Sequence, residues 1–304
     1  MATNSCIIAG LILAGAFASP ICVAQNAVHS DPQDHVWLAN DKVRVGLKKS
    51  SGGAIFWVSP ADSNKSLINS YDRGRLIQQS WYGKPDGSLW NTKPWRWNPV
   101  QGGDWQGKSA TILEQKNEAT TSWLRTQPIH WATGDVLQDC VMEQTISLDA
   151  ELIHIRYRFI YSGTEAHPAQ HQELPAFFVE PEFATLVLYE GGQPWTGGEL
   201  ARSSPAFPNE YKKTTEHWAA YVNDMDQGIG CFVPVADELT CYRFGAEKRN
   251  PASCSYFAPI RTLAITPGFK WDYEVWITMG SVAEIRKRFQ TIALTTTTSK
   301  PGTP

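Results

Sequence analysis

The strongest constraint on the fold comes from a ten-residue segment in which apolar and polar side chains alternate. Over residues 152–161, Ile153, Ile155, Tyr157 and Phe159 alternate with His154, Arg156, Arg158 and Ile160. Because successive side chains of a β-strand point to opposite faces, this pattern predicts a sheet with one buried face and one polar face. Residues 141–148 precede it, joined by the tripeptide Asp149-Ala150-Glu151, so the two segments are predicted to form an antiparallel hairpin.

Short segments of similar character recur along the chain. They lie at residues 36–38, 43–47, 54–58, 110–113, 122–127, 177–179, 185–189, 218–223, 228–233, 255–260 and 271–279. Turn-forming Gly, Asn, Asp and Ser residues separate many of them. One helix is predicted over residues 282–290, because Ser281 and Glu284 form a capping-box pattern and Ile285 and Phe289 are four apart. The chain is therefore predicted to be all-β, a large antiparallel β-sandwich with one short C-terminal helix, in a single domain over residues 25–292.

Three stretches of sequence resemble the galactose-mutarotase-like β-supersandwich. They are Asn-Asp-Lys-Val-Arg-Val at residues 40–45, Gly-Gly-Ala-Ile at residues 52–55, and Ala-Ala-Tyr-Val at residues 219–222 followed by Gly-Ile-Gly-Cys-Phe-Val-Pro at residues 228–234. Sugar mutarotases, several polysaccharide lyases and domains of glycoside hydrolases share that fold. The resemblance therefore implies work on carbohydrates, although a fold does not by itself establish an activity.

Both ends of the sequence have compositions unlike a folded domain. Residues 1–24 contain no charged side chain, and their apolar run at residues 7–18 is too short to cross a bilayer as a helix. Small residues follow, which is typical of a signal peptide and predicts a secreted or periplasmic protein with no membrane segment after cleavage. Residues 293–304, rich in Thr, Ser and Pro, predict a disordered tail.

The net charge and the spacing of cysteines and histidines bear on nucleic-acid binding, disulfides and metal sites. The net charge of −3 argues against a nucleic-acid partner, which favours a basic surface. Four cysteines lie beyond the predicted signal peptide, and of these Cys231 and Cys241 flank a hairpin-like segment, so they are the first candidates for a disulfide. No Cys-x-x-Cys or His-x-x-x-His spacing indicates zinc, and we predict neither metal nor cofactor.

Residues 71–105 are unusually rich in tryptophan. Five of the 13 tryptophans fall here, among Arg, Gln, Asp and Gly residues. Flat aromatic faces beside planar hydrogen-bonding groups suit a sugar ring, whereas buried Arg, Gln or Asp would need partners. The alternative is a well-anchored loop whose tryptophans cover the edge of a sheet. Under the first interpretation the substrate-binding residues are Asp72, Arg73, Gln78, Gln79, Trp81, Tyr82, Trp97 and Asp104, with Trp195 at the rim.

A second cluster of chemically active side chains lies at residues 167–182. His171 and Glu173 are two apart, so on a strand they share one face and form a plausible acid/base unit. A salt-bridged polar loop is the alternative. Arg75 or Arg73, which share one extended segment, is predicted to bind a uronate carboxylate, and the alternative is that Asp72 or Asp104 pairs with these arginines. His130 is a further candidate base.

These residues leave several functions open. The first is a secreted enzyme that cleaves a glycan, and the density of Arg and Gln favours a polysaccharide lyase acting on a uronate-containing polysaccharide. A glycoside hydrolase would instead pair Glu173 with Asp72, Asp104 or Glu143. A non-catalytic sugar-binding module and a mutarotase or epimerase are the remaining alternatives. In every case the partner is a sugar, most simply a poly- or oligosaccharide.

Overall fold

The computed structural model describes residues 32–245 and 251–298, and it confirms an all-β sandwich. The predicted signal peptide, and residues 299–304 of the predicted tail, lie outside the described residues. Every strand pairing in the described part is antiparallel. No helix in those ranges is long and apolar enough to cross a membrane.

Two large sheets and one small hairpin account for the strands. The ten-stranded sheet follows the order β1 (His35–Ala39), β2 (Val43–Lys48), β3 (Ala54–Pro60), β4 (Ile77–Ser80), β13 (His167–Val179), β20 (Cys254–Ile265), β19 (Glu238–Phe244) and β16 (Glu210–Lys213), with β7 (Pro99–Val100) and β10 (Ile129–His130) joined beside β4. The nine-stranded sheet follows the order β15 (Ala201–Ser203), β14 (Thr185–Leu188), β17 (Trp218–Val222), β18 (Gln227–Phe232), β21 (Lys270–Ser281), β12 (Leu152–Tyr161), β11 (Cys140–Asp149), β9 (Thr121–Gln127) and β8 (Thr111–Asn117). The hairpin is β5 (Pro85–Trp90) with β6 (Lys93–Arg96), and the short 3₁₀ turns are η1 (Pro32–Asp34) and η2 (Lys49–Ser51).

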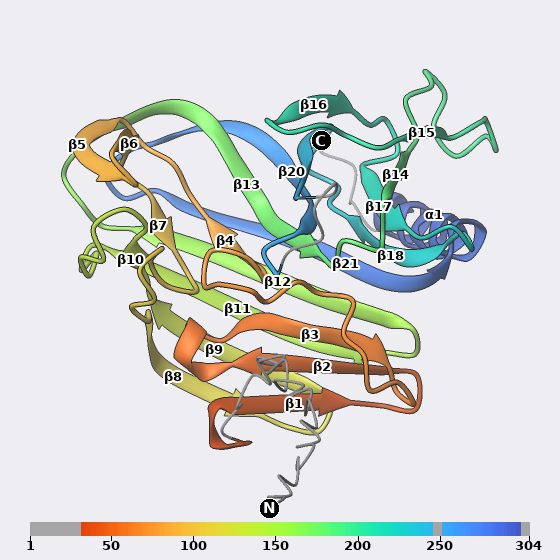
Figure 1. Cartoon of the computed structure of the whole chain (residues 1–304), viewed down its shortest axis with the longest axis horizontal. Helices are drawn as coiled ribbons and strands as arrows, with labels where there is room; N and C mark the ends of the chain where they lie inside the picture. The colour runs from red at the N-terminus through yellow and green to blue at the C-terminus, as the bar shows by residue number, and fades with distance from the viewer. Residues whose placement is uncertain (1–31, 246–250, 299–304) are drawn as a thin grey trace, which may run out of the picture. The chain divides into compact units, whose positions relative to one another are not determined.

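The predicted hairpin is confirmed as β11 and β12, which run side by side in Figure 1. Its register pairs Val141 with Ile160 and Leu148 with Ile153. The polar face of β12 carries Arg158, whose Nε donates to Asp272 on β21.

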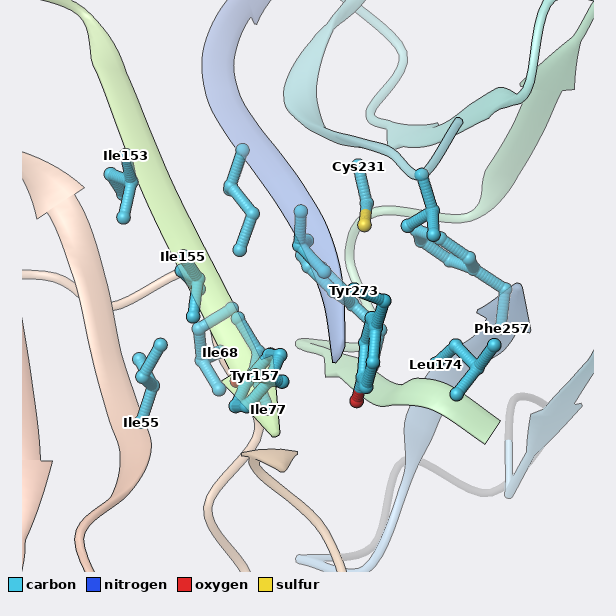
Figure 2. Close-up of a cluster of buried hydrophobic side chains, with 14 of the residues drawn as sticks. Ile55, Ile68, Ile77, Ile153, Ile155, Tyr157, Leu174, Cys231, Phe257 and Tyr273 are labelled. Carbon is cyan, nitrogen blue, oxygen red and sulfur yellow. The ribbon is translucent and has the colours of Figure 1, made fainter. Parts of the chain in front are cut away.

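The apolar faces of the two sheets meet in one hydrophobic core. Ile153, Ile155 and Tyr157 of β12 are buried there with Ile55 of β3 and Phe257 of β20 (Figure 2). The strand alternation read from the sequence therefore fixes which face of each sheet is inside.

Helix α1 (Val282–Thr298) is longer than predicted. The capping box is present, since the backbone N–H of Ser281 donates to Glu284 Oε2 at 2.8 Å. Ile285, Phe289 and Ile292 all pack in a cluster with Phe232, so the apolar spacing continues past residue 290. Residues 293–298 are consequently helical rather than disordered.

The predicted disulfide is absent: Cys231 and Cys241 are free and buried, like the other two cysteines of the described chain, Cys140 and Cys254. Cys231 lies on β18 of the nine-stranded sheet, and Cys241 lies on β19 of the ten-stranded sheet. The segment between them crosses from one sheet to the other instead of forming a hairpin.

Two tryptophans predicted to face a sugar belong to the core instead. Trp81 is fully buried and stacks on Phe159 with ring centroids 4.5 Å apart. Trp97 is 8% exposed and stacks on His167 at 4.0 Å. Their rings contribute to stability by excluding water between the sheets, and neither lines an open surface.

Replacing Trp81 by Ala should lower the free energy of unfolding by about 3–5 kcal/mol, the usual cost of removing a buried Trp. Trp37, which is 36% exposed on β1, provides a matched control, and Trp37→Ala should cost much less. Urea unfolding of both variants measures this. Equal losses in the two variants would contradict the placement of Trp81 in the core.

Candidate functional site

A cavity of about 370 Å³ opens on the face of the ten-stranded sheet that points away from the core. Its lining includes Ser80, Tyr82, Glu173, Tyr242 and Tyr256. In β13, Leu174 points into the core while its neighbour Glu173 lines the cavity. The register of β13 shifts just after Glu173, as is common beside functional sites.

Glu173 is surrounded by hydroxyl groups. Tyr256 donates its hydroxyl to Glu173 Oε1 at 2.6 Å. Burial raises the pKa of Glu173 above its ordinary value, against the opposing effect of hydrogen bonds from Tyr256, Tyr82 and Ser80. Burial also raises the pKa of Tyr82 and of Tyr256 well above the ordinary value, so both are neutral donors. A half-buried carboxyl with hydroxyl donors can exchange a proton with a bound molecule.

One wall of the cavity is tryptophan. Trp90 and Trp95, from the β5–β6 hairpin, have ring centroids 4.8 Å apart, and Trp90 lies 6.2 Å from Trp131. Trp95 donates its Nε1–H to Asn98 Oδ1 at 3.2 Å. Gly74 lies flat against Trp131, since a Cβ at position 74 would come 2.1 Å from that ring. These rings give the cavity apolar surface next to fixed polar groups.

The remaining lining combines further aromatic side chains with the Arg75 guanidinium. Phe207 and Phe244 have ring centroids 5.6 Å apart, and Phe207 is 60% exposed. Arg75 lies 5.9 Å from the Phe244 ring and forms an ion pair with Asp72 at 3.5 Å. Its Nη1 donates to Asn69 Oδ1 at 3.2 Å. The guanidinium is thereby held in place at the edge of the cavity.

The segment that carries the two arginines is a turn and not the predicted extended chain. Asp72 Oδ1 accepts the backbone N–H of Gly74 at 2.9 Å and of Arg75 at 3.0 Å. This local hydrogen bonding bends the chain. Arg75 therefore lines the cavity, whereas Arg73 lines a separate hollow.

The structure brings together four of the predicted site residues, Asp72, Arg75, Tyr82 and Glu173. Several others hold loops and strands in place. Gln78 donates to the carbonyls of Arg73 and Arg75 and accepts the N–H of Gly102, and Gln79 donates to the Glu143 carbonyl. Asp104 accepts the backbone N–H groups of Gln106 and Lys108.

The predicted histidines and Trp195 lie outside the cavity. His130 is buried, with Nε2 at 2.8 Å from Asp86 and Nδ1 accepting the Ala132 N–H. Both ring nitrogens therefore already have hydrogen-bond partners within the protein. His171 is exposed and contacts Tyr211 edge-on. Trp195 packs beside Phe232 under helix α1.

Sequence reasoning missed the two tyrosines on β19 and β20 that complete the floor. Tyr242 and Tyr256 are directly paired in register, with ring centroids 4.5 Å apart. An aromatic residue at a position that alternates with buried core residues was the available signal. Asn98 and Asn209 gave none, because single asparagines occur in many loops.

No group of His, Cys, Asp and Glu side chains in residues 32–245 and 251–298 is arranged to hold a metal ion. The residues that line the cavity can bind a ligand through aromatic faces, hydroxyls and one guanidinium, and they can move a proton at Glu173.

Known structures share this fold. A galactose mutarotase-like protein from Lactobacillus casei ATCC 334 is similar with a TM-score of 0.53 and 11% identity, over 81% of this chain and 99% of that one. The Slr1438 protein from Synechocystis sp. PCC 6803 has a TM-score of 0.51 and 12% identity, over 81% and 96%. A galactose mutarotase-like protein from Clostridium acetobutylicum has a TM-score of 0.50 and 7% identity, over 82% and 95%.

The fold is therefore the galactose mutarotase-like β-sandwich, as the sequence resemblance implied. At these identities the similarity defines the fold alone. No protein-family model matches the chain, and no curated protein matches it by sequence.

The raised pKa of Glu173 predicts how stability depends on pH. A carboxyl whose pKa is raised by folding binds its proton more tightly in the folded state. The free energy of unfolding then falls as pH rises from the ordinary value of 4.5 through the raised value. Glu173→Gln should remove the contribution of Glu173 to this decrease in the free energy of unfolding. The variant should therefore gain stability relative to the wild type as pH rises.

Urea unfolding of both proteins across that pH range measures the difference. Burial also raises the pKa of Glu180, to about 7, but Glu180 is present in both proteins, so its contribution cancels. A constant difference between the two proteins at all pH values would contradict the raised pKa of Glu173.

Proposed function

We propose that the protein is an exported enzyme that cleaves a glycan bound in the cavity, and that it is a polysaccharide lyase acting on a uronate-containing chain. The observation that carries the proposal is Glu173, a carboxyl with a raised pKa that is hydrogen-bonded to Tyr256 inside an aromatic cavity. Export is proposed from the signal-peptide pattern of residues 1–24. Fold neighbours described as galactose mutarotase-like support a sugar as the ligand.

The number of carboxyl groups that line the cavity favours elimination over hydrolysis. Hydrolysis by the usual route needs two carboxyl groups that face each other across the glycosidic bond. The only other carboxyl that lines the cavity in the described part of the chain is Asp72. Its Oδ1 accepts two backbone N–H groups, and its Oδ2 pairs with Arg75. Elimination needs one base, one proton donor and a cation near the uronate carboxylate.

The residues of the cavity suit these three roles. Arg75 is the cation. Its Nη1 is held by Asn69 Oδ1 and the Ala252 carbonyl, which leaves Nε and Nη2 to bind a carboxylate through two parallel hydrogen bonds. Its Asp72 partner is 3.5 Å from Nε, a long contact that a substrate carboxylate can compete with. The neutral hydroxyl of Tyr256 is the proton donor, and Glu173 in its ionised form is the base.

The proposed reaction conserves protons. Glu173 accepts the proton from C5 of the uronate, and the electron pair of that C–H bond forms the C4=C5 double bond. The bond from C4 to the glycosidic oxygen breaks, and its electron pair stays on the oxygen. Tyr256 donates its hydroxyl proton to that oxygen. The proton held by Glu173 then passes across the 2.6 Å hydrogen bond to restore Tyr256.

A panel of neutral and uronate-containing polysaccharides tests this function. We expect new reducing ends together with ultraviolet absorbance from an unsaturated sugar, on uronate polymers alone. Reducing ends without that absorbance would mean hydrolysis. Binding without any cleavage would mean a sugar-binding module, and interconversion of free sugar anomers alone would mean a mutarotase.

Two variants assign the chemistry to the cavity. Glu173→Gln and Tyr256→Phe should each lower kcat by at least a hundredfold, the usual contribution of a general acid or base being roughly 10²–10⁴. His171→Gln is the matched control, because His171 lies on the same strand two residues away but is exposed and outside the cavity. Full activity in a folded Glu173→Gln protein would exclude the proposed role.

A further inference from the structure

A second hollow of about 330 Å³ adjoins the cavity. Its lining includes Lys48, Tyr71, Asp72, Arg73 and Trp105. Asp72 lines both the hollow and the cavity, so the two sites adjoin at the turn that carries it. We call this second site the Arg73 hollow.

The Arg73 hollow carries positive charge that no carboxylate neutralises by direct contact. Within the described part of the chain, neither Arg73 nor Lys48 forms an ion pair. Arg73 instead donates Nε–H to the Gly107 carbonyl at 2.7 Å and Nη1–H to Ser51 Oγ at 3.0 Å. Both acceptors are neutral, so neither offsets the charge of the guanidinium, which has further N–H groups to offer.

Each of the two acidic residues of the hollow already has an ion-pair or hydrogen-bond partner. Asp72 pairs with Arg75 on the side of the cavity. Asp104 is 3% exposed, and its Oδ1 accepts the backbone N–H groups of Gln106 and Lys108. An anionic ligand entering the hollow would therefore meet Arg73 and Lys48 without displacing an existing ion pair.

The local backbone is shaped to hold the Arg73 side chain in this position. A Cβ at Gly103 would come 2.7 Å from Arg73 Cδ and 2.2 Å from the Lys108 carbonyl oxygen. Gly103 also has a φ of +140°, which disfavours any other residue. Glycine at this position lets the arginine lie along the loop, so its guanidinium is fixed before a ligand arrives.

An exposed aromatic ring of the hollow contacts Arg75 of the cavity. Tyr71 is 56% exposed and lines the hollow, and the Arg75 guanidinium, which lines the cavity, lies 5.1 Å from the centre of its ring. A chain of sugars that leaves the cavity over Arg75 thus meets an aromatic face next and a cationic hollow beyond it.

We propose that the Arg73 hollow is a distal subsite that binds the carboxylate of a second uronate in the same polysaccharide chain. This inference rests on the proposed function, because it assumes that the cavity holds the sugar to be cleaved. If the subsite is present, the substrate is an acidic polymer that spans both sites and not a short or neutral sugar. Arg73 and Lys48 then determine the preference for long acidic chains and take no part in the chemistry.

Binding to the Glu173→Gln protein tests the subsite separately from catalysis. The probes are the disaccharides and octasaccharides of galacturonate and of alginate, titrated by calorimetry. Adding Arg73→Gln should weaken octasaccharide binding by about tenfold or more, as expected for the loss of a charge-assisted hydrogen bond. Disaccharide binding should weaken less, because with one ring in the cavity a disaccharide has at most one ring left to reach the hollow.

Two further variants control for charge and for folding. Lys48→Gln should weaken octasaccharide binding in the same selective way, and it provides a second reading if Arg73→Gln is poorly folded. Lys116→Gln removes the same charge from β8 of the other sheet and should change neither probe.

The possible outcomes separate the subsite from the proposed function. Equal weakening of both probe lengths, or no weakening in Arg73→Gln and Lys48→Gln, would overturn the subsite even if the wild type cleaves uronate polymers. Selective loss of octasaccharide binding with no cleavage by the wild type would support the subsite and overturn the lyase. A folded protein that binds none of these acidic probes would overturn both.

Discussion

The burial of the inner faces of the two sheets against each other is the interaction on which the rest of the structure depends. It fixes the direction of every side chain in the strands that cross the middle of the ten-stranded sheet. Leu174 of β13 is held in the core, so its neighbour Glu173 must lie on the other face. The same constraint on β20 buries Phe257 and leaves Tyr256 to face Glu173. The candidate site is thus positioned by strand alternation at a rigid surface.

The chemistry of the cavity follows from its partial exclusion of water. Aromatic side chains surround one carboxyl, and burial raises its pKa, while hydroxyl donors limit that rise. The result is a carboxyl poised to change its protonation state nearer to neutral pH than an exposed glutamate would. A guanidinium at the edge of the same cavity supplies a fixed positive charge. Together these features explain why a uronate is proposed over a neutral sugar.

Much of the fold could be predicted from the sequence, because period-two alternation is a local signal. The hairpin of β11 and β12 was predicted with its partners from such a pattern. Prediction from the sequence failed where contacts between residues far apart in the chain decide the structure. Cys231 and Cys241 look like the two sides of a hairpin in sequence, but the chain between them crosses to the other sheet. The end of helix α1 depended on whether Ile292 had a core to pack against.

The candidate site was less predictable, for the same physical reason. The composition of residues 71–105 indicated an aromatic surface, but sequence spacing cannot tell which tryptophans face the core. Trp81 stacks inside on Phe159, while Trp90 and Trp95 line the cavity. Glu173 was identified from its position on a strand, whereas its partner Tyr256 is 83 residues away and is brought to it only by the pairing of β13 with β20.

The central claim is that the cavity around Glu173 holds the sugar that reacts. A crystal structure of the Glu173→Gln protein with a uronate octasaccharide tests it most directly. The account predicts a sugar ring between the tryptophan wall and Tyr256, with its carboxylate on Arg75 and its C5 next to position 173. An ordered octasaccharide bound elsewhere on the protein, with the cavity left empty, would contradict the account.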